Sequence, residues 1–220
     1  GADNFGAGGR SVIAYNMTRP LTNDFQVDFL AIGKLKNPSF HRIIEENGGH
    51  VQHVKEVSSK IKRLRSIYSI LKKEKYDIVH INVDDAIEGL FNIILSKLSG
   101  AKIVLHAHTT SSSRGEGFIG RLKMLSAKKI VNFLVDYKMA CSLEAADYLY
   151  GDTDLSDVAI IKNGIIINDF LYNEELRQNV RENLNIPMEA IVLGTVGRLS
   201  YPKNPEFMVS LIQTLFSKAP

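Results

Sequence analysis

Two cations in one loop, Arg198 and Lys203, are the side chains of this sequence best placed to do chemistry. A hydrophobic run at residues 191–196 precedes them and predicts a buried strand, and the residues from Pro205 onward predict a helix. In an open α/β sheet, ligands bind in the crevice beyond the carboxyl ends of the strands. Arginine offers a planar fork of donors and lysine a point charge, so the pair suits a diphosphate.

A solvated surface loop is the alternative interpretation of these two cations. Local residues argue against it, because Gly197 allows a close approach of the backbone directly after the strand. Asn204 is suited to cap the following helix, and Pro205 is suited to its first position. We therefore expect the loop to be held at both ends.

A second candidate group lies nearer the amino terminus. Gly8 and Gly9 precede a predicted helix, residues 10–17, where a glycine loop can bring backbone N–H groups to a phosphate; a tight turn is the alternative. His106 and His108 come at a strand end and share one face if the strand continues. The two histidines could bind a metal ion, but no cysteine, aspartate or glutamate follows them at the spacing of a metal site. The alternative is that both histidines are packed or hydrogen-bonded within the fold.

Other chemistries find less support. A dinucleotide fingerprint requires glycine or alanine where Ser11 stands, and its acidic residue is missing because Asp28 lies within a strand. Asp84 and Glu88 could form a hydrolase pair, but Asp84 is better interpreted as the N-cap of the next helix. Ser142 lacks the surroundings of a hydrolase nucleophile.

Strand-like and helix-like runs alternate along the chain, which predicts an α/β fold, a Rossmann-like doubly wound parallel sheet. The expected strands are residues 25–32, 77–82, 102–106, 138–142 and 158–162, with helices at 86–98, 118–133 and 174–184. A polar break follows. We expect an N-terminal domain at residues 1–164, a linker at 165–187, and the start of a second domain at 188–220.

Bulk composition is that of an ordinary globular protein, with 45% hydrophobic and 23% charged residues among 220 and a net charge of +3. The single cysteine, Cys141, excludes an internal disulfide and fits a reducing compartment. No apolar run predicts a transmembrane helix, and no secretory signal is found. We expect a cytoplasmic protein.

Positive charge is concentrated between residues 55 and 75, where eight cations face Glu56 and Glu74 on a predicted amphipathic helix. The apolar stripe of that helix is predicted to hold Ile61, Leu64, Tyr68 and Leu71. A second basic stretch contains Arg114, Arg121, Lys123, Lys128 and Lys129. A solvated face and an anionic membrane surface are the two open interpretations. Nucleic acid is disfavoured because aromatic residues are not interleaved with the cations.

The motif V-G-R-L-S-x-x-K-N, residues 196–204, resembles the start of the C-terminal domain in retaining glycosyltransferases of family 4, which have the GT-B fold. It is similar in particular to the branch that builds capsular and exopolysaccharides. Gly8 with Gly9 and residues 103–109, 140–142 and 160–165 resemble further motifs of that family, in the same order and with similar spacing.

The resemblance implies transfer of a sugar from a nucleoside-diphosphate donor to a lipid-linked or polysaccharide acceptor, without a metal or other cofactor. It implies that Arg198 and Lys203 stabilise the departing diphosphate. Gly8 and Gly9 would lie under the donor phosphates, and His108, rather than His106, would contact the donor sugar.

Two features of the family are missing from these residues: a buried strand ahead of the glycine loop, and an E-x7-E motif that holds the donor. We therefore expect the 220 residues to be a piece of a longer enzyme and to be inactive alone. The alternative function is a non-catalytic nucleotide-binding or membrane-surface module. A dehydrogenase or epimerase is a third, which Ser11 disfavours.

Overall fold

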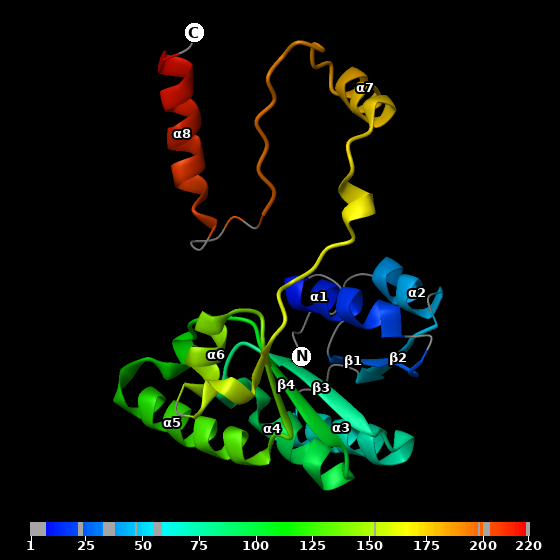
Figure 1. Ribbon diagram of the computed structural model, residues 1–220, viewed down its shortest axis with the longest axis vertical. Coiled ribbons are helices and arrows are strands. Elements are labelled where there is room, and N and C mark those ends of the chain that lie inside the picture. Colours follow the sequence, from blue (N-terminus) through cyan, green and yellow to red (C-terminus); the bar gives the residue numbers. More distant parts are fainter. Residues whose placement is uncertain are drawn as a thin grey trace. The chain divides into compact units, whose positions relative to one another are not determined.

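The computed structural model describes residues 8–21, 24–32, 38–46, 48–54, 59–151, 153–197, 199 and 203–218. Contacts within the chain divide it into two units, Gly1–Ile167 and Asn168–Pro220 (Figure 1). In the part of the chain that is described, no helix is long and apolar enough to cross a bilayer.

The first unit alternates strands with helices, as the sequence predicts, and every pair of neighbouring strands is parallel. This confirms a Rossmann-like α/β architecture. The strands are β1 (Asp28–Ile32), β2 (His50–Val54), β3 (Ile78–Val83), β4 (Lys102–Ala107), β5 (Tyr137–Ala140) and β6 (Val158–Ile160). The α-helices are α1 (Gly9–Thr18), α2 (Pro38–Glu46), α3 (Lys60–Glu74), α4 (Ala86–Ser99), α5 (Gly117–Leu134) and α6 (Leu143–Tyr150). Short 3-10 turns are η1 (Arg19–Leu21), η2 (Ser113–Gly115) and η3 (Leu155–Asp157).

Hydrogen bonding divides the described strands into two parallel sheets. β1 pairs with β2, and the other four strands follow the order β3-β4-β5-β6. Helix α3 links the two, because its Ile67 and Leu71 belong to a buried cluster with Ile32 of β1, against which Val79 of β3 also packs. Ile61, which we predicted to lie on the apolar stripe of this helix, is instead 64% exposed.

The main core lies between the four-stranded sheet and helices α4, α5 and α6 (Figure 1). Ile103 and Leu105 of β4, Ile93 of α4 and Val131 of α5 are completely buried in it. The Tyr150 hydroxyl donates to the Leu105 carbonyl at 2.7 Å, and burial raises the pKa of that phenol. The core thus fixes β3 and β4 relative to α4, whose first turn lines the candidate site.

The second unit contains helices α7 (Glu174–Asn183) and α8 (Pro205–Lys218), and the turn η4 (Ile167–Phe170) spans its boundary. Asn204 caps α8 as predicted, since its side-chain oxygen accepts from the Phe207 amide at 3.3 Å. The predicted buried strand at residues 191–196 is wrong: these residues form no strand and are exposed. A strand requires a neighbour for its backbone groups, and the described residues of this unit contain none.

Candidate functional site

Polar side chains gather where the carboxyl ends of β3 and β4 meet the first turn of α4. The register pairs Asn82 with His106, so the residues that leave both strands reach the same edge of the sheet. In open parallel sheets this edge is the usual place for ligands. The groups at this edge therefore form the candidate site of the first unit.

Asp85 is the centre of this cluster. Its side chain is fully buried, and its Oδ1 atom accepts from the Glu88 amide at 2.8 Å, so Asp85 is the N-cap of α4. Our prediction that Asp84 is the cap is therefore wrong by one residue. Oδ2 of Asp85 accepts from Ser112 at 2.6 Å and from Arg114 at 2.7 Å, which ties the loop after β4 to the start of α4.

Burial alone would raise the pKa of the Asp85 carboxyl group. The hydrogen bonds from Ser112, the Glu88 amide and Arg114 outweigh that effect and bring the pKa below its usual value. Asp85 is therefore ionised at neutral pH, as a cap with an arginine partner should be.

Arg10, which follows the glycine pair, joins α1 to the same cluster. Its guanidinium lies 3.2 Å from both carboxylate oxygens of Glu88 and 3.2 Å from the Asp84 carboxylate. Glu88 in turn accepts from the Asp84 amide at 2.9 Å. We did not single out Arg10 from the sequence, because the partner that gives it a role lies 78 residues away.

Gly8 and Gly9 form the start of α1. The Gly8 carbonyl accepts from the Ser11 amide at 3.1 Å, and a Cβ built on either glycine would meet no atom of the described residues within 4 Å. The Gly8 backbone is extended, with φ of −120°, so the conformation itself does not require glycine. Open space beside a helix N-terminus that carries no acid in its first turn suits an anion.

Three histidines stack in a row beside this edge. The ring of His106 lies 5.4 Å from that of His80 and 4.1 Å from that of His108, measured between centroids. His108 Nε2 lies 2.7 Å from the side-chain carbonyl oxygen of Asn82, an acceptor, so Nε2 carries the proton and Nδ1 keeps its lone pair. Nδ1 of His108 and both ring nitrogens of His106 have no partner among the residues that the structure describes.

Burial makes these imidazoles hard to protonate. It lowers the pKa of His106 to about 3, with a smaller effect from the two neighbouring rings. It lowers the pKa of His108 to about 4, with a further effect from the Arg10 charge, and it also lowers the pKa of His80. His108 is therefore a neutral hydrogen-bonding group at pH 7, and not a general acid.

These depressed pKa values predict acid sensitivity. Below pH 6.5 the unfolded chain protonates its histidines, while the folded chain holds His106 and His108 neutral down to about pH 4. The free energy of unfolding should thus decrease as the pH is lowered, by up to about 1.4 kcal/mol per pH unit for each histidine. Urea titrations between neutral pH and pH 5 measure the slope. His106→Leu should flatten it, and equal slopes in both proteins would contradict the pKa values.

Within the described ranges, no group of three or more histidine, cysteine, aspartate or glutamate side chains is arranged to hold a metal ion. Ser142 caps α6, with its hydroxyl accepting from the Ala145 amide at 3.2 Å, and Cys141 is half-buried.

The predicted diphosphate loop belongs to the second unit. Arg198 lies outside the described residues. Lys203 is exposed, and a Cβ on Gly197 would lie 3.7 Å from its Cγ atom, so the two residues are close neighbours. The roles assigned to Arg198 and Lys203 stay predictions.

The sequence is similar to two curated proteins, both of which are named as sugar-transferring enzymes. The chain is 24% identical over 212 residues to a protein named putative glycosyltransferase EpsF of Bacillus subtilis, covering 93% of this chain and 54% of that protein. It is 28% identical over 157 residues to a UDP-Gal:α-D-GlcNAc-diphosphoundecaprenol α-1,3-galactosyltransferase of Escherichia coli, covering 66% of this chain and 38% of that protein. No family model matches the sequence.

Solved structures agree on the fold. Anabaena HepE in complex with UDP-glucose superposes with a TM-score of 0.72 at 16% identity, over 94% of this chain and 54% of that chain. A glycosyltransferase of Rickettsia africae superposes with a TM-score of 0.68 at 15% identity, over 95% and 54%. The chain thus spans about half the length of the proteins it resembles, and over that span it has the fold of GT-B glycosyltransferases.

Proposed function

We propose that this chain is the acceptor-side part of a retaining glycosyltransferase of family 4, which moves a sugar from a nucleoside diphosphate to an acceptor. The observation that carries the proposal is the pair of sequence relatives, which both have names of sugar-transferring enzymes. The Rossmann-like fold and the edge-of-sheet cluster agree with it.

The donor in this proposal is a uridine diphosphate sugar. The Escherichia coli relative is named for UDP-Gal, and the Anabaena neighbour is a complex with UDP-glucose. Transfer proceeds without a metal. The negative charge that develops on the leaving diphosphate is instead stabilised by Arg198 and Lys203, through charge-assisted hydrogen bonds.

His108 orients the donor sugar. Its neutral ring has a lone pair on a buried Nδ1 atom that lacks a partner among the described residues. A buried acceptor of this kind requires a hydrogen-bond donor, which in this proposal is a sugar hydroxyl. The bond to Asn82 fixes the tautomer and the ring plane. Gly8 and Gly9 leave space for phosphate beside the N-terminus of α1, which Arg10 holds against Glu88.

The acceptor in this proposal is lipid-linked or a polysaccharide, in the synthesis of a capsule or exopolysaccharide. The acceptor named for the Escherichia coli relative is a diphosphoundecaprenol lipid. Lys60, Lys62 and Arg65 on the exposed side of α3 supply a basic surface for anionic lipid, worth about 1 kcal/mol per cation. The protein would then act in the cytoplasm at the inner face of the membrane.

A thermal-shift panel tests the donor. The relatives are about twice as long, so the proposal places binding and turnover in a protein of their length that contains these residues. Such a protein should be stabilised by one uridine diphosphate sugar, by about 2.7 kcal/mol at 100 times its dissociation constant. No shift with any nucleotide sugar, together with binding to lipid vesicles, would favour a non-catalytic surface module instead.

A further inference from the structure

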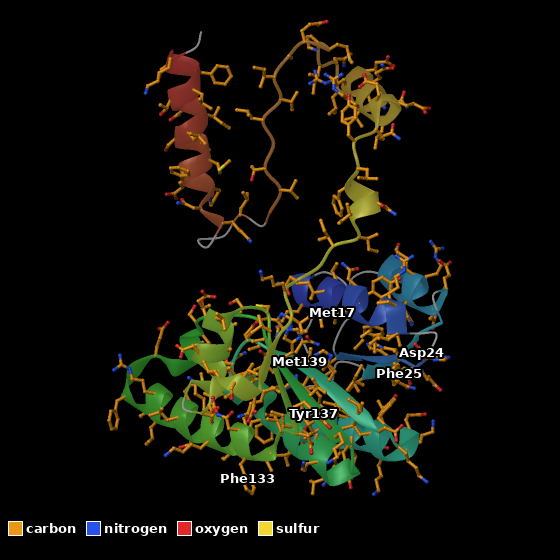
Figure 2. All side chains as sticks on the ribbon, in the orientation of Figure 1. Met17, Asp24, Phe25, Phe133, Tyr137 and Met139 are labelled. Carbon is orange, nitrogen blue, oxygen red and sulfur yellow. The ribbon has the colours of Figure 1, made fainter. Side chains whose placement is uncertain are left out.

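Helix α5 carries a row of large apolar side chains that no described residue of the first unit covers. We define the α5 apolar stripe as Phe118, Ile119, Leu122, Leu125 and Phe133, all of which are exposed. Phe118 is 85% and Phe133 is 86% exposed, and Figure 2 shows Phe133 projecting from the helix away from the sheet. They lie about 22 Å apart along the helix axis. Water-exposed phenylalanines at both ends of one helix are unusual in a globular domain.

The stripe is not an unpacked core face. Met124, Ala127 and Val131 are the buried residues of α5, and they occupy the opposite side of the helix. Because that side already packs against the sheet layer, α5 has two apolar faces. The outer face must therefore have a partner that the described part of the first unit does not supply.

Charge identifies the chemistry of this partner. α5 contains four cations, Arg121, Lys123, Lys128 and Lys129, and no acidic residue. Arg121, Lys123 and Lys129 are exposed, and none forms an ion pair with any residue that the structure describes. At helical spacing Arg121 and Lys123 flank the α5 apolar stripe on its two sides, and Lys129 lies on the face of the stripe itself. Uncompensated cations beside and within an apolar stripe complement a surface that is apolar inside and anionic outside, as an anionic bilayer is.

We propose that α5 lies in the interface of an anionic bilayer, with the α5 apolar stripe among the acyl chains and its lysines at the headgroups. The long lysine side chains allow this, because their methylene stems lie along apolar surface while the ammonium reaches water. The inference extends the membrane partner of the proposed function from α3 to α5, and it rests on that part of the proposed function.

A single introduced tryptophan provides the test, because the chain contains none. Phe133→Trp places a reporter on the stripe, and Phe25→Trp, at an exposed phenylalanine outside α5, is the matched control. With vesicles of phosphatidylcholine and phosphatidylglycerol, the emission of the Phe133→Trp variant should shift to the blue and be quenched by brominated acyl chains. The emission of the Phe25→Trp variant should not change.

Binding gives a second readout. Phe118→Ser with Phe133→Ser should raise the lipid concentration for half-maximal binding by about tenfold or more, whereas Phe25→Ser should leave it unchanged. Lys62→Gln with Arg65→Gln on α3 tests the electrostatic surface separately. Vesicle binding that depends on α3, with no emission shift in the Phe133→Trp variant, would overturn the role of α5 and keep the membrane partner.

Two further results would also overturn the inference. One is the absence of any vesicle binding, which would remove the membrane partner altogether. The other is a dimer that the double serine variant converts to a monomer, since a second copy would then cover the stripe. Nucleotide-sugar binding is measured without lipid, so its failure is separable from each of these outcomes.

Discussion

Replacing Asp85 with alanine is expected to lower the free energy of unfolding by about 2–3 kcal/mol. Loss of the helix cap accounts for about 1 kcal/mol. The remainder comes from the buried bonds to Ser112 and Arg114, although Arg114 is half-exposed and can turn to water. The loop after β4 should also loosen, because Asp85 is its tie to α4.

Urea denaturation followed by circular dichroism measures this loss, and two variants make it specific. Asp84→Ala removes the neighbouring carboxylate, which pairs with Arg10 and is 35% exposed, so it should cost less than about 1 kcal/mol. Asp85→Asn keeps a capping oxygen and should be intermediate. A larger cost at Asp84 than at Asp85 would show that the cap is wrongly assigned.

The single variants Arg198→Ala and Lys203→Ala should each transfer sugar at a rate roughly ten- to a hundred-fold lower than that of the unchanged protein. In the proposed mechanism each variant loses one charge-assisted hydrogen bond to the leaving diphosphate, worth about 1.5–3 kcal/mol. Because the charge grows as the glycosidic bond breaks, the loss should appear mainly in kcat and less in KM.

Conservative and remote changes sharpen this second prediction. Arg198→Lys keeps the charge and loses the planar fork, so it should recover only part of the rate. Lys218→Ala, at the exposed end of α8, should leave kcat unchanged. Unchanged rates in both Arg198→Ala and Lys203→Ala would remove the pair from the mechanism.

Much of the fold could be predicted from local periodicity. Strands β3 and β4 coincide with short apolar runs in the sequence, and helices α4 and α5 coincide with runs whose apolar residues recur at helical spacing. Strand β2 was missed because His50–Val54 alternates with histidines and is too short and polar to stand out. Which strands hydrogen-bond to one another is a tertiary property, and local periodicity does not predict it.

The site could be predicted only where its signal was local. The roles of His108 and the α1 glycines stay predictions, which rest on local motifs and on the family resemblance, whereas the contact of Arg10 with Glu88 depends on chain topology. Asp84 and Asp85 are adjacent and chemically equal, so only the backbone geometry at Asp85 identifies the cap. The run at residues 191–196 has strand composition, but hydrogen-bonding partners decide whether a strand forms.

In the proposed function, this chain belongs to an enzyme that transfers a sugar from a nucleoside diphosphate. The most direct measurement is the transfer of labelled sugar from uridine diphosphate sugars by the longest protein that contains these residues, with and without a diphosphate-linked polyprenol acceptor. We expect acceptor-dependent transfer from one donor, at a rate that falls in His108→Ala. Absence of binding and of transfer with every nucleotide sugar, by a folded protein, would contradict the claim.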